Sequence, residues 1–280
     1  MAKLMLVDGS NLLFQMFYGM PARITNKDGK AIQGTLGFVG ALLKTVRKVC
    51  PTHLAVFFDG ECHNPRRDMD ADYKANRPDF SQIPEEDTPF SQLPDIFAAL
   101  DHLNIKHCET TVCETDDWIA GYVSRYGDNH DIVIMSQDSD FFQLISDHVS
   151  VLRYRGDKSV LCTSDYIQQT LGISPTQYAA YKSLTGDNSD NIRGVDKVGP
   201  KTAAALMNQF GTLECLVKQA QSIQKQSIRK SVTEQSERIL KNFELIFLRG
   251  YDDLPFILDE LAFSDIGFTT TQVLQNIGLR

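Results

Sequence analysis

The sequence places acidic side chains in three short polar strings, and these residues have the clearest chemical potential. The strings ETDD, SQDSD and GDNSDN each carry two or three acids within five residues, and further single acids end two short apolar runs. The nine acids are Asp8, Asp59, Glu114, Asp116, Asp117, Asp138, Asp140, Asp187 and Asp190. If they converge, their repulsion requires cations, and oxygen ligands without His or Cys favour Mg²⁺ or Mn²⁺. Two such ions are the usual arrangement for phosphodiester hydrolysis.

Any one of these acids also has a simpler interpretation. An Asp at a strand end is usually a solvated turn residue or a helix cap, and Asp138 could cap the helix that follows it. That interpretation weakens for the whole set because three separate strings concentrate negative charge. We therefore expect a metal centre.

The pattern around the acids predicts the elements that position them. Short apolar runs alternate with amphipathic segments in the first half, which indicates βα units and a mainly parallel, covered sheet. The expected strands are Leu4–Val7, His53–Phe58, Ile105–Cys108, Ile132–Met135 and Val149–Arg153. The expected helices are Thr35–Val49, one from Thr115, Ser164–Leu171, Pro175–Leu184, Lys201–Phe210 and about Glu234–Leu248. Ligands bind outside the carboxyl ends of such strands, so the acids should meet there.

Composition at first argues against a nucleic-acid binder. The 280 residues carry 28 Lys and Arg against 36 Asp and Glu, a net charge of −8. Without the nine presumed ligands, 27 acids face 28 bases, so the remaining surface is near neutrality. No apolar run is long enough to span a bilayer. The six cysteines show no zinc spacing, which is typical of a reduced, cytoplasmic protein.

Five strings, in order, resemble the 5′ nuclease family of bacteria and phages. This flap endonuclease and 5′–3′ exonuclease group also forms the N-terminal domain of bacterial DNA polymerase I. The strings are LVDGSNLLFQMFY, VFFD, ETDD, SQDSDFFQL and GDNSDNIRGV. The resemblance covers about residues 4 to 250 and fills every acidic position of the family pattern.

The resemblance implies an α/β fold with a PIN-like, mainly parallel sheet flanked by helices, a helical arch and a C-terminal helix–hairpin–helix-like (H3TH) DNA-binding region. We predict a nuclease core at 1–165, with the arch at about 62–90, and a helical region at 166–280, with the helix–hairpin–helix-like element at about 178–211.

The resemblance also implies two or more bound Mg²⁺ or Mn²⁺ ions and a division of the acids between them. The first ion would be held by Asp8, Asp59, Glu114 and Asp116. The second would be held by Asp138, Asp140 and Asp187, with Asp116 near both. Asp117 and Asp190 would act partly through bound waters.

The string YKANRP lies between the second and third acidic strings and supplies Tyr73, Lys74 and Arg77. Alone, such a trio is typical of a solvated loop. In the family this segment is the arch that a single-stranded 5′ end passes through or under, so Tyr73 would stack on a base while Lys74 and Arg77 clamp the phosphate. If the segment is helical in a DNA complex, Tyr73 and Arg77 share a face. Arg66 would contact DNA before the arch, although Pro65 stands where relatives usually carry an aromatic residue.

The string GVDKVGPKTAAALMNQFG resembles the family's helix–hairpin–helix-like element. Backbone N–H groups of the turn at Gly194 and Gly199, with Lys201, would bind a duplex phosphate. The resemblance also implies a K⁺ ion held by carbonyls near Val195 and Val198. Lys197 occupies a position that is usually glycine, so a positive φ there would be strained, but its ammonium could contact phosphate. The alternative is an element packed only for stability.

A basic stretch follows this element and could extend the duplex track. It contains Lys218, Lys225, Arg229, Lys230, Arg238 and Lys241. Such runs are also typical of solvated helix faces.

We therefore predict a structure-specific, Mg²⁺-dependent 5′ nuclease of DNA replication or repair. It would cut DNA with a free 5′ end at flaps or junctions and degrade it exonucleolytically. It would be monomeric, without a membrane partner, and located in the bacterial cytoplasm at the nucleoid. Because the chain ends at Arg280, we expect a free-standing nuclease. Two alternatives are a PIN-type ribonuclease, which would lack the arch and GVxxVGPKTA signatures, and a homologue that binds flaps without cutting.

Overall fold

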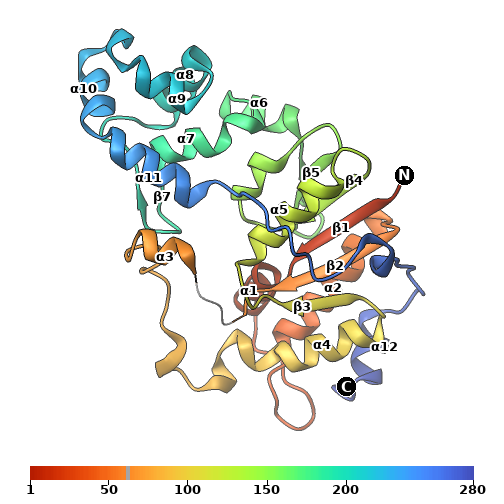
Figure 1. The fold of residues 1–280 in the computed structure, drawn as a ribbon. Helices are drawn as coiled ribbons and strands as arrows, with labels where there is room; N and C mark the ends of the chain where they lie inside the picture. The colour runs from red at the N-terminus through yellow and green to blue at the C-terminus, as the bar shows by residue number, and fades with distance from the viewer. Residues whose placement is uncertain (61–63) are drawn as a thin grey trace.

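The computed structural model describes residues 1–60 and 64–280, and its centre is a six-stranded sheet (Figure 1). The strand order is β3-β2-β1-β4-β5-β6, with β1 to β5 parallel and β6 antiparallel to β5. The strands are β1 (Lys3–Asp8), β2 (His53–Phe58), β3 (Lys106–Glu109), β4 (Asp131–Met135), β5 (Val149–Arg153) and β6 (Val160–Cys162). The predicted mainly parallel sheet is confirmed; β6 was not predicted, because its three residues carry no clear pattern.

Helices cover both faces of the sheet, which explains why its central strands are continuously apolar. Successive side chains point to opposite faces, so Leu4 and Leu6 join one core while Met5 and Val7 join the other. The Met5 face packs against α1 (Gly9–Gly19), α2 (Gln33–Val49), α4 (Leu93–His102) and α12 (Thr270–Asn276). The Leu4 face packs against α5 (Thr115–Tyr126) and continues into the C-terminal helices.

The helices between β6 and the last helix form a second layer on the side of the Leu4 core, to which they contribute apolar side chains (Figure 1). They are α6 (Ser164–Leu171), α7 (Tyr178–Thr185), α8 (Pro200–Phe210), α9 (Leu213–Lys218), α10 (Gln226–Glu234) and α11 (Ser236–Ile246). A two-stranded ribbon of β7 (Gly186–Asp187) and β8 (Ile192–Arg193) follows α7. The helix expected over about Glu234–Leu248 is confirmed as α11, which a break at Gln235 separates from α10.

The chain after α11 returns across the outside of α5 to the sheet (Figure 1). A Cβ at Gly121 would lie 2.2 Å from the carbonyl oxygen of Tyr251, so glycine permits this close crossing. The amide of Tyr251 donates to the Asp117 carbonyl at 2.9 Å. This hydrogen bond holds the start of α5, where the ETDD string lies, against the segment that follows α11.

The segment predicted as the arch starts in α3 (Pro65–Met69) and continues through turns. Residues 62 and 63 of the predicted range lie outside the described part of the chain. Tyr73–Arg77 forms turns here, and single 3₁₀ turns follow at Phe80–Gln82, Glu85–Asp87 and Pro89–Gln92. Within the described ranges, none of the helices has the length and apolar character needed to cross a membrane.

Candidate active site

The predicted acids do meet beyond the carboxyl ends of the strands. Asp8 ends β1 and also caps α1, accepting from the Asn11 amide at 3.0 Å. Asp59 follows β2 and accepts from the amide of Thr115, the first residue of α5, at 2.9 Å. Asp138 follows β4, and its amide donates to Ser136 Oγ, whose hydroxyl donates to Asp8 at 2.8 Å. The bonds through Ser136 join the ends of β1 and β4, and the bond from Thr115 joins the end of β2 to α5.

We call Asp8, Asp59, Asp116 and Asp138 the strand-end group, because the charges of the other three all raise the pKa of Asp116. Burial raises the pKa of Asp8 to about 7, and the charge of Asp59 adds to that effect. Burial also raises the pKa of Asp116 well above its ordinary value, with Asp138 and Asp8 as the next causes. Among the residues that the structure describes, no Lys or Arg forms an ion pair with any of the four. Crowded carboxylates without a paired cation suit a hard divalent ion.

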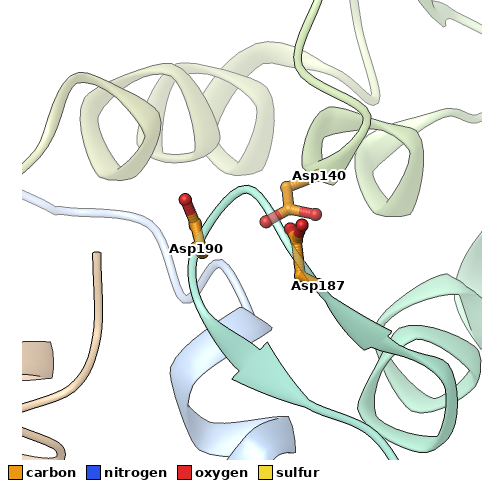
Figure 2. A group of neighbouring side chains, drawn as sticks. All are labelled: Asp140, Asp187 and Asp190. Carbon is orange, nitrogen blue, oxygen red and sulfur yellow. The ribbon is translucent and has the colours of Figure 1, made fainter. Parts of the chain in front are cut away.

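A second set, the loop group, consists of Asp140, Asp187 and Asp190 (Figure 2). One carboxylate oxygen from each lies within 4.8 Å of the others. Figure 2 shows Asp140 and Asp187 facing each other, with Asp187 and Asp190 on the ribbon of β7 and β8. Burial, and then the charge of Asp138, raises the pKa of Asp140 to about 7. The charge of Asp138 therefore raises a pKa in both groups, that of Asp116 in the strand-end group and that of Asp140 in the loop group.

Lys182 on α7 lies within the loop group and was missed by the sequence analysis. Its Nζ forms an ion pair with Asp140 and lies 2.6 Å from Asp187 Oδ2. Burial alone would raise the pKa of Asp187, but Lys182 holds it below its ordinary value. The available signal was a lysine inside the apolar string YAAYKSLT, five residues before Asp187. A buried lysine in such a helix needs an acidic partner.

The predicted arch residues also lie among the acids. Lys74 Nζ lies 2.5 Å from Glu114 Oε1, and Arg77 lies 3.0 Å from Asp190 Oδ1. The Tyr73 hydroxyl is 3.3 Å from Asp190 Oδ2. Burial would raise the pKa of Glu114, but Lys74, and then Arg66, lower it. The structure thus brings Tyr73, Lys74 and Arg77 to the metal-binding candidates, while base stacking and phosphate clamping stay predictions.

Arg66 is buried between two acids rather than exposed on the surface. Its guanidinium lies 2.7 Å from Glu114 and 2.8 Å from Asp117, and Nε donates to the Leu245 carbonyl at 3.1 Å. This geometry fixes the two outer acids of the ETDD string. The predicted DNA contact of Arg66 stays a prediction.

The predicted helix–hairpin–helix-like turn joins β8 to α8. A Cβ at Gly194 would lie 2.4 Å from the backbone of Thr185, so only glycine fits against the end of α7. Gly199 is the N-cap of α8, and Lys201 is exposed in the first turn of that helix. Val195 and Val198 are buried at 4% and 6% exposure.

Lys197 has a positive φ of 67°, the strained conformation for a non-glycine residue at this position. Its side chain is exposed, so it is free to approach a phosphate. The turn's DNA contacts and its K⁺ site stay predictions.

Comparisons with known proteins agree with this architecture. Two family models match in succession, a 5′–3′ exonuclease N-terminal resolvase-like domain at residues 3–172 and a 5′–3′ exonuclease C-terminal SAM fold at 173–268. The chain is 34% identical over 264 residues to DNA polymerase I of Rhizobium leguminosarum, covering 91% of this chain and 25% of that protein. It is 31% identical over 258 residues to the thermostable DNA polymerase I of Thermus thermophilus, covering 92% and 30%. The chain therefore spans about a quarter to a third of these relatives.

Solved structures that share the fold include two in complex with DNA. The bacteriophage T5 D15 flap endonuclease, in a pseudo-enzyme–product complex with DNA and metal ions, has a TM-score of 0.72 at 21% identity, covering 98% of this chain and 99% of its own. The catalytic core of Rad2 in complex with DNA substrate has a TM-score of 0.61 at 16% identity, covering 99% and 93%.

Proposed function

Because the chain belongs to the 5′–3′ exonuclease family, we propose that it hydrolyses DNA phosphodiesters at 5′ flaps and junctions and degrades DNA from a free 5′ end. The observation that carries this proposal is the meeting of two carboxylate groups with Lys74 and Arg77 beside them. Negative groups concentrated at strand ends suit metal ions, while adjacent cations suit a substrate phosphate. Both requirements of phosphodiester hydrolysis are therefore supported at one place.

The donor set fits Mg²⁺ or Mn²⁺, since every candidate ligand is a carboxylate. One ion would be held by Asp8, Asp59, Glu114 and Asp116, and another by Asp138, Asp140 and Asp187, with Asp117 and Asp190 acting through waters. Such ions would supply an activated water and neutralise charge on the phosphate.

The chain's own side chains would orient the substrate. The Arg77 side chain is 51% exposed, so its guanidinium can leave Asp190 and bind a phosphate bidentately. Lys74 is buried at 8% exposure and would act close to the acids. Tyr73, at 4% exposure, would need to turn outward to stack on a base.

Duplex binding would involve the second layer of the molecule. We assign the phosphate contacts to the turn at Gly194–Gly199, with Lys197 and Lys201, and a K⁺ ion to carbonyls near Val195 and Val198. The basic stretch from Lys218 to Lys241 would continue the track. We divide the chain into a nuclease core at 1–165 and a DNA-binding region at 166–280, acting as a monomer in the cytoplasm at the nucleoid.

The test is cleavage of an end-labelled 5′-flap duplex by the purified chain, with Mg²⁺, with Mn²⁺ and with EDTA. We expect cutting near the junction with either ion and none with EDTA. Asp140→Asn should abolish cutting and retain flap binding in Ca²⁺. The matched control is Asp147→Asn, an exposed acid before β5 at the opposite end of the strands. Flap binding without any cutting would support a non-cleaving homologue, and cutting of RNA alone would support a ribonuclease.

A further inference from the structure

Residues 72–77, which we call the arch base, are hydrogen-bonded to the loop that carries Asp187 and Asp190. The Lys74 amide donates to the Asp190 carbonyl at 3.0 Å. The Asn76 side chain donates to the Asn188 carbonyl at 2.8 Å, and the Asn191 side chain donates to the Asp72 carbonyl at 2.8 Å. These bonds run in both directions between segments more than 110 residues apart in sequence. Figure 1 shows α3 beside the ribbon that begins at β7.

The backbone on both sides of this junction is unusual. Lys74 has a φ of 57° and Asn191 a φ of 59°, in the left-handed region that non-glycine residues rarely adopt. Asn tolerates this region, but a lysine has no local interaction that favours it. Such a conformation persists where its surroundings determine it, and strained residues of this kind gather at functional sites. The hydrogen bonds across the junction supply that determination.

The junction decides where the arch cations lie. With its amide held by Asp190, Lys74 directs Nζ across the Tyr73 ring, 4.9 Å from the centroid, to Glu114. Arg77 is three residues further along the same turn and pairs with Asp190 itself. A lysine with extended backbone at this position would aim its side chain elsewhere. The positions of Lys74 and Arg77 therefore depend on the loop that carries Asp187 and Asp190.

We propose that Asn76 and Asn191 are positioning residues that couple the arch base to the Asp187–Asp190 loop. Ordering of that loop by a divalent ion then also orders the turn that carries Lys74 and Arg77. Neither amide is charged, and both residues are exposed, so replacing them removes the two side-chain bonds of the junction without changing the charges of the site. The inference rests on the proposed function for its kinetic consequence, whereas the coupling itself can be measured without turnover.

Hydrogen exchange measured by mass spectrometry on the full chain tests the coupling. Mg²⁺ is titrated without DNA while peptides covering 70–77 and 186–193 are followed. In the wild type, both peptides should gain protection with the same midpoint. In Asn76→Ala and Asn191→Ala, the loop peptide should still respond, while the arch peptide exchanges at least tenfold faster and loses its response. An arch peptide that follows Mg²⁺ equally in both variants, or that never follows it in the wild type, overturns the proposal.

A matched control separates coupling from general loosening of the arch. Asp70 pairs with Lys241 of α11 at 2.8 Å, which is a contact of the same turn with a different element. Asp70→Asn weakens this contact and leaves both asparagine ties in place, so its arch peptide should respond as in the wild type. If Asp70→Asn loses the Mg²⁺ response to the same extent, the asparagines are not specific and the proposal fails.

Cleavage kinetics provide the second readout. Asn76→Ala and Asn191→Ala should lower kcat about tenfold or more with KM within about twofold, because positioning of Lys74 and Arg77 is lost while duplex binding is kept. Asn76→Gln, which retains the amide donor, should restore part of the rate. An unchanged kcat in both alanine variants overturns the proposal. Coupled exchange in a wild type that does not cut would instead refute only the proposed function.

Discussion

The two carboxylate groups of the site differ in how their charge is compensated. In the loop group, Lys182 pairs with Asp140 and Asp187, and Arg77 pairs with Asp190. Basic side chains of the protein itself therefore compensate these acids. Within the described residues, the strand-end group has hydrogen-bond donors but no ion pair. Similar acids therefore depend on different partners. The comparison indicates that an ion in the strand-end group would relieve repulsion, whereas an ion in the loop group would compete with Lys182.

The largest effect should be the same in both groups, because the proposed phosphodiester hydrolysis uses both. Asp116→Asn and Asp187→Asn should each lower kcat on a 5′-flap duplex by on the order of 10³-fold. Single-turnover cleavage at saturating Mg²⁺ measures this, with Asp147→Asn as the control. A variant of either group that keeps near wild-type turnover would show that only the other group serves catalysis.

The next effect should distinguish the groups through Lys182. Replacing this buried lysine with methionine leaves Asp140 and Asp187 facing each other without their cation, so Lys182→Met should lower the free energy of unfolding by about 3 kcal/mol. Urea unfolding in EDTA measures the loss. Mg²⁺ should stabilise this variant more than it stabilises the wild type, since the competing ammonium is gone.

The control for this variant is Lys44→Met, which removes an exposed ion pair with Asp157 and should leave the unfolding midpoint unchanged. Equal midpoints for Lys182→Met and the wild type would show that Lys182 does not compensate the loop group.

Smaller stability changes of opposite sign should follow from removing one charge in each group. Asp116→Asn removes a carboxylate crowded by Asp138 and Asp8, so it should stabilise the protein in EDTA by about 1 kcal/mol. Asp187→Asn removes a partner of Lys182 and should destabilise it by about 1 to 2 kcal/mol. Urea midpoints with the same sign of change would contradict the distinction between the groups.

Much of this site could be predicted because it follows from local patterns. Apolar runs that end in acids place carboxylates at strand ends, and the rule for parallel sheets brings those ends together. Lys182 was not predicted because a single lysine in a helix is usually solvated, although the apolar string around it was a signal that its face is covered. Asn76 and Asn191 were not predicted because their bonds join segments that the fold alone brings together. The sequence also did not show that Glu114 and Asp117 surround Arg66, whose DNA contact stays a prediction.

The smallest effect should be the pH dependence of stability, which concerns a property that the strand-end group and the loop group share. Asp8 in the strand-end group and Asp140 in the loop group both have a pKa raised to about 7, although Asp140 pairs with Lys182. Their ordinary value is 3.8. Between these values the folded state binds more protons than the unfolded state, so stability in EDTA should fall as pH rises from about 4 to 7 and then level off. Glu114 and Asp187 have lowered pKa values and act oppositely, losing stabilisation below their ordinary range.

Urea midpoints between pH 4 and 8 in EDTA measure this dependence. Asp8→Asn and Asp140→Asn should each flatten the decline between pH 4 and 7, because each removes one of the protons that the fold takes up. If only Asp8→Asn flattens the decline, Lys182 keeps Asp140 ionised throughout this pH range. The two groups then differ more in proton affinity than their shared pKa of about 7 implies. If both flatten it equally, a buried lysine beside Asp140 does not offset burial and the charge of Asp138, and the two groups differ in their partners more than in their proton affinity.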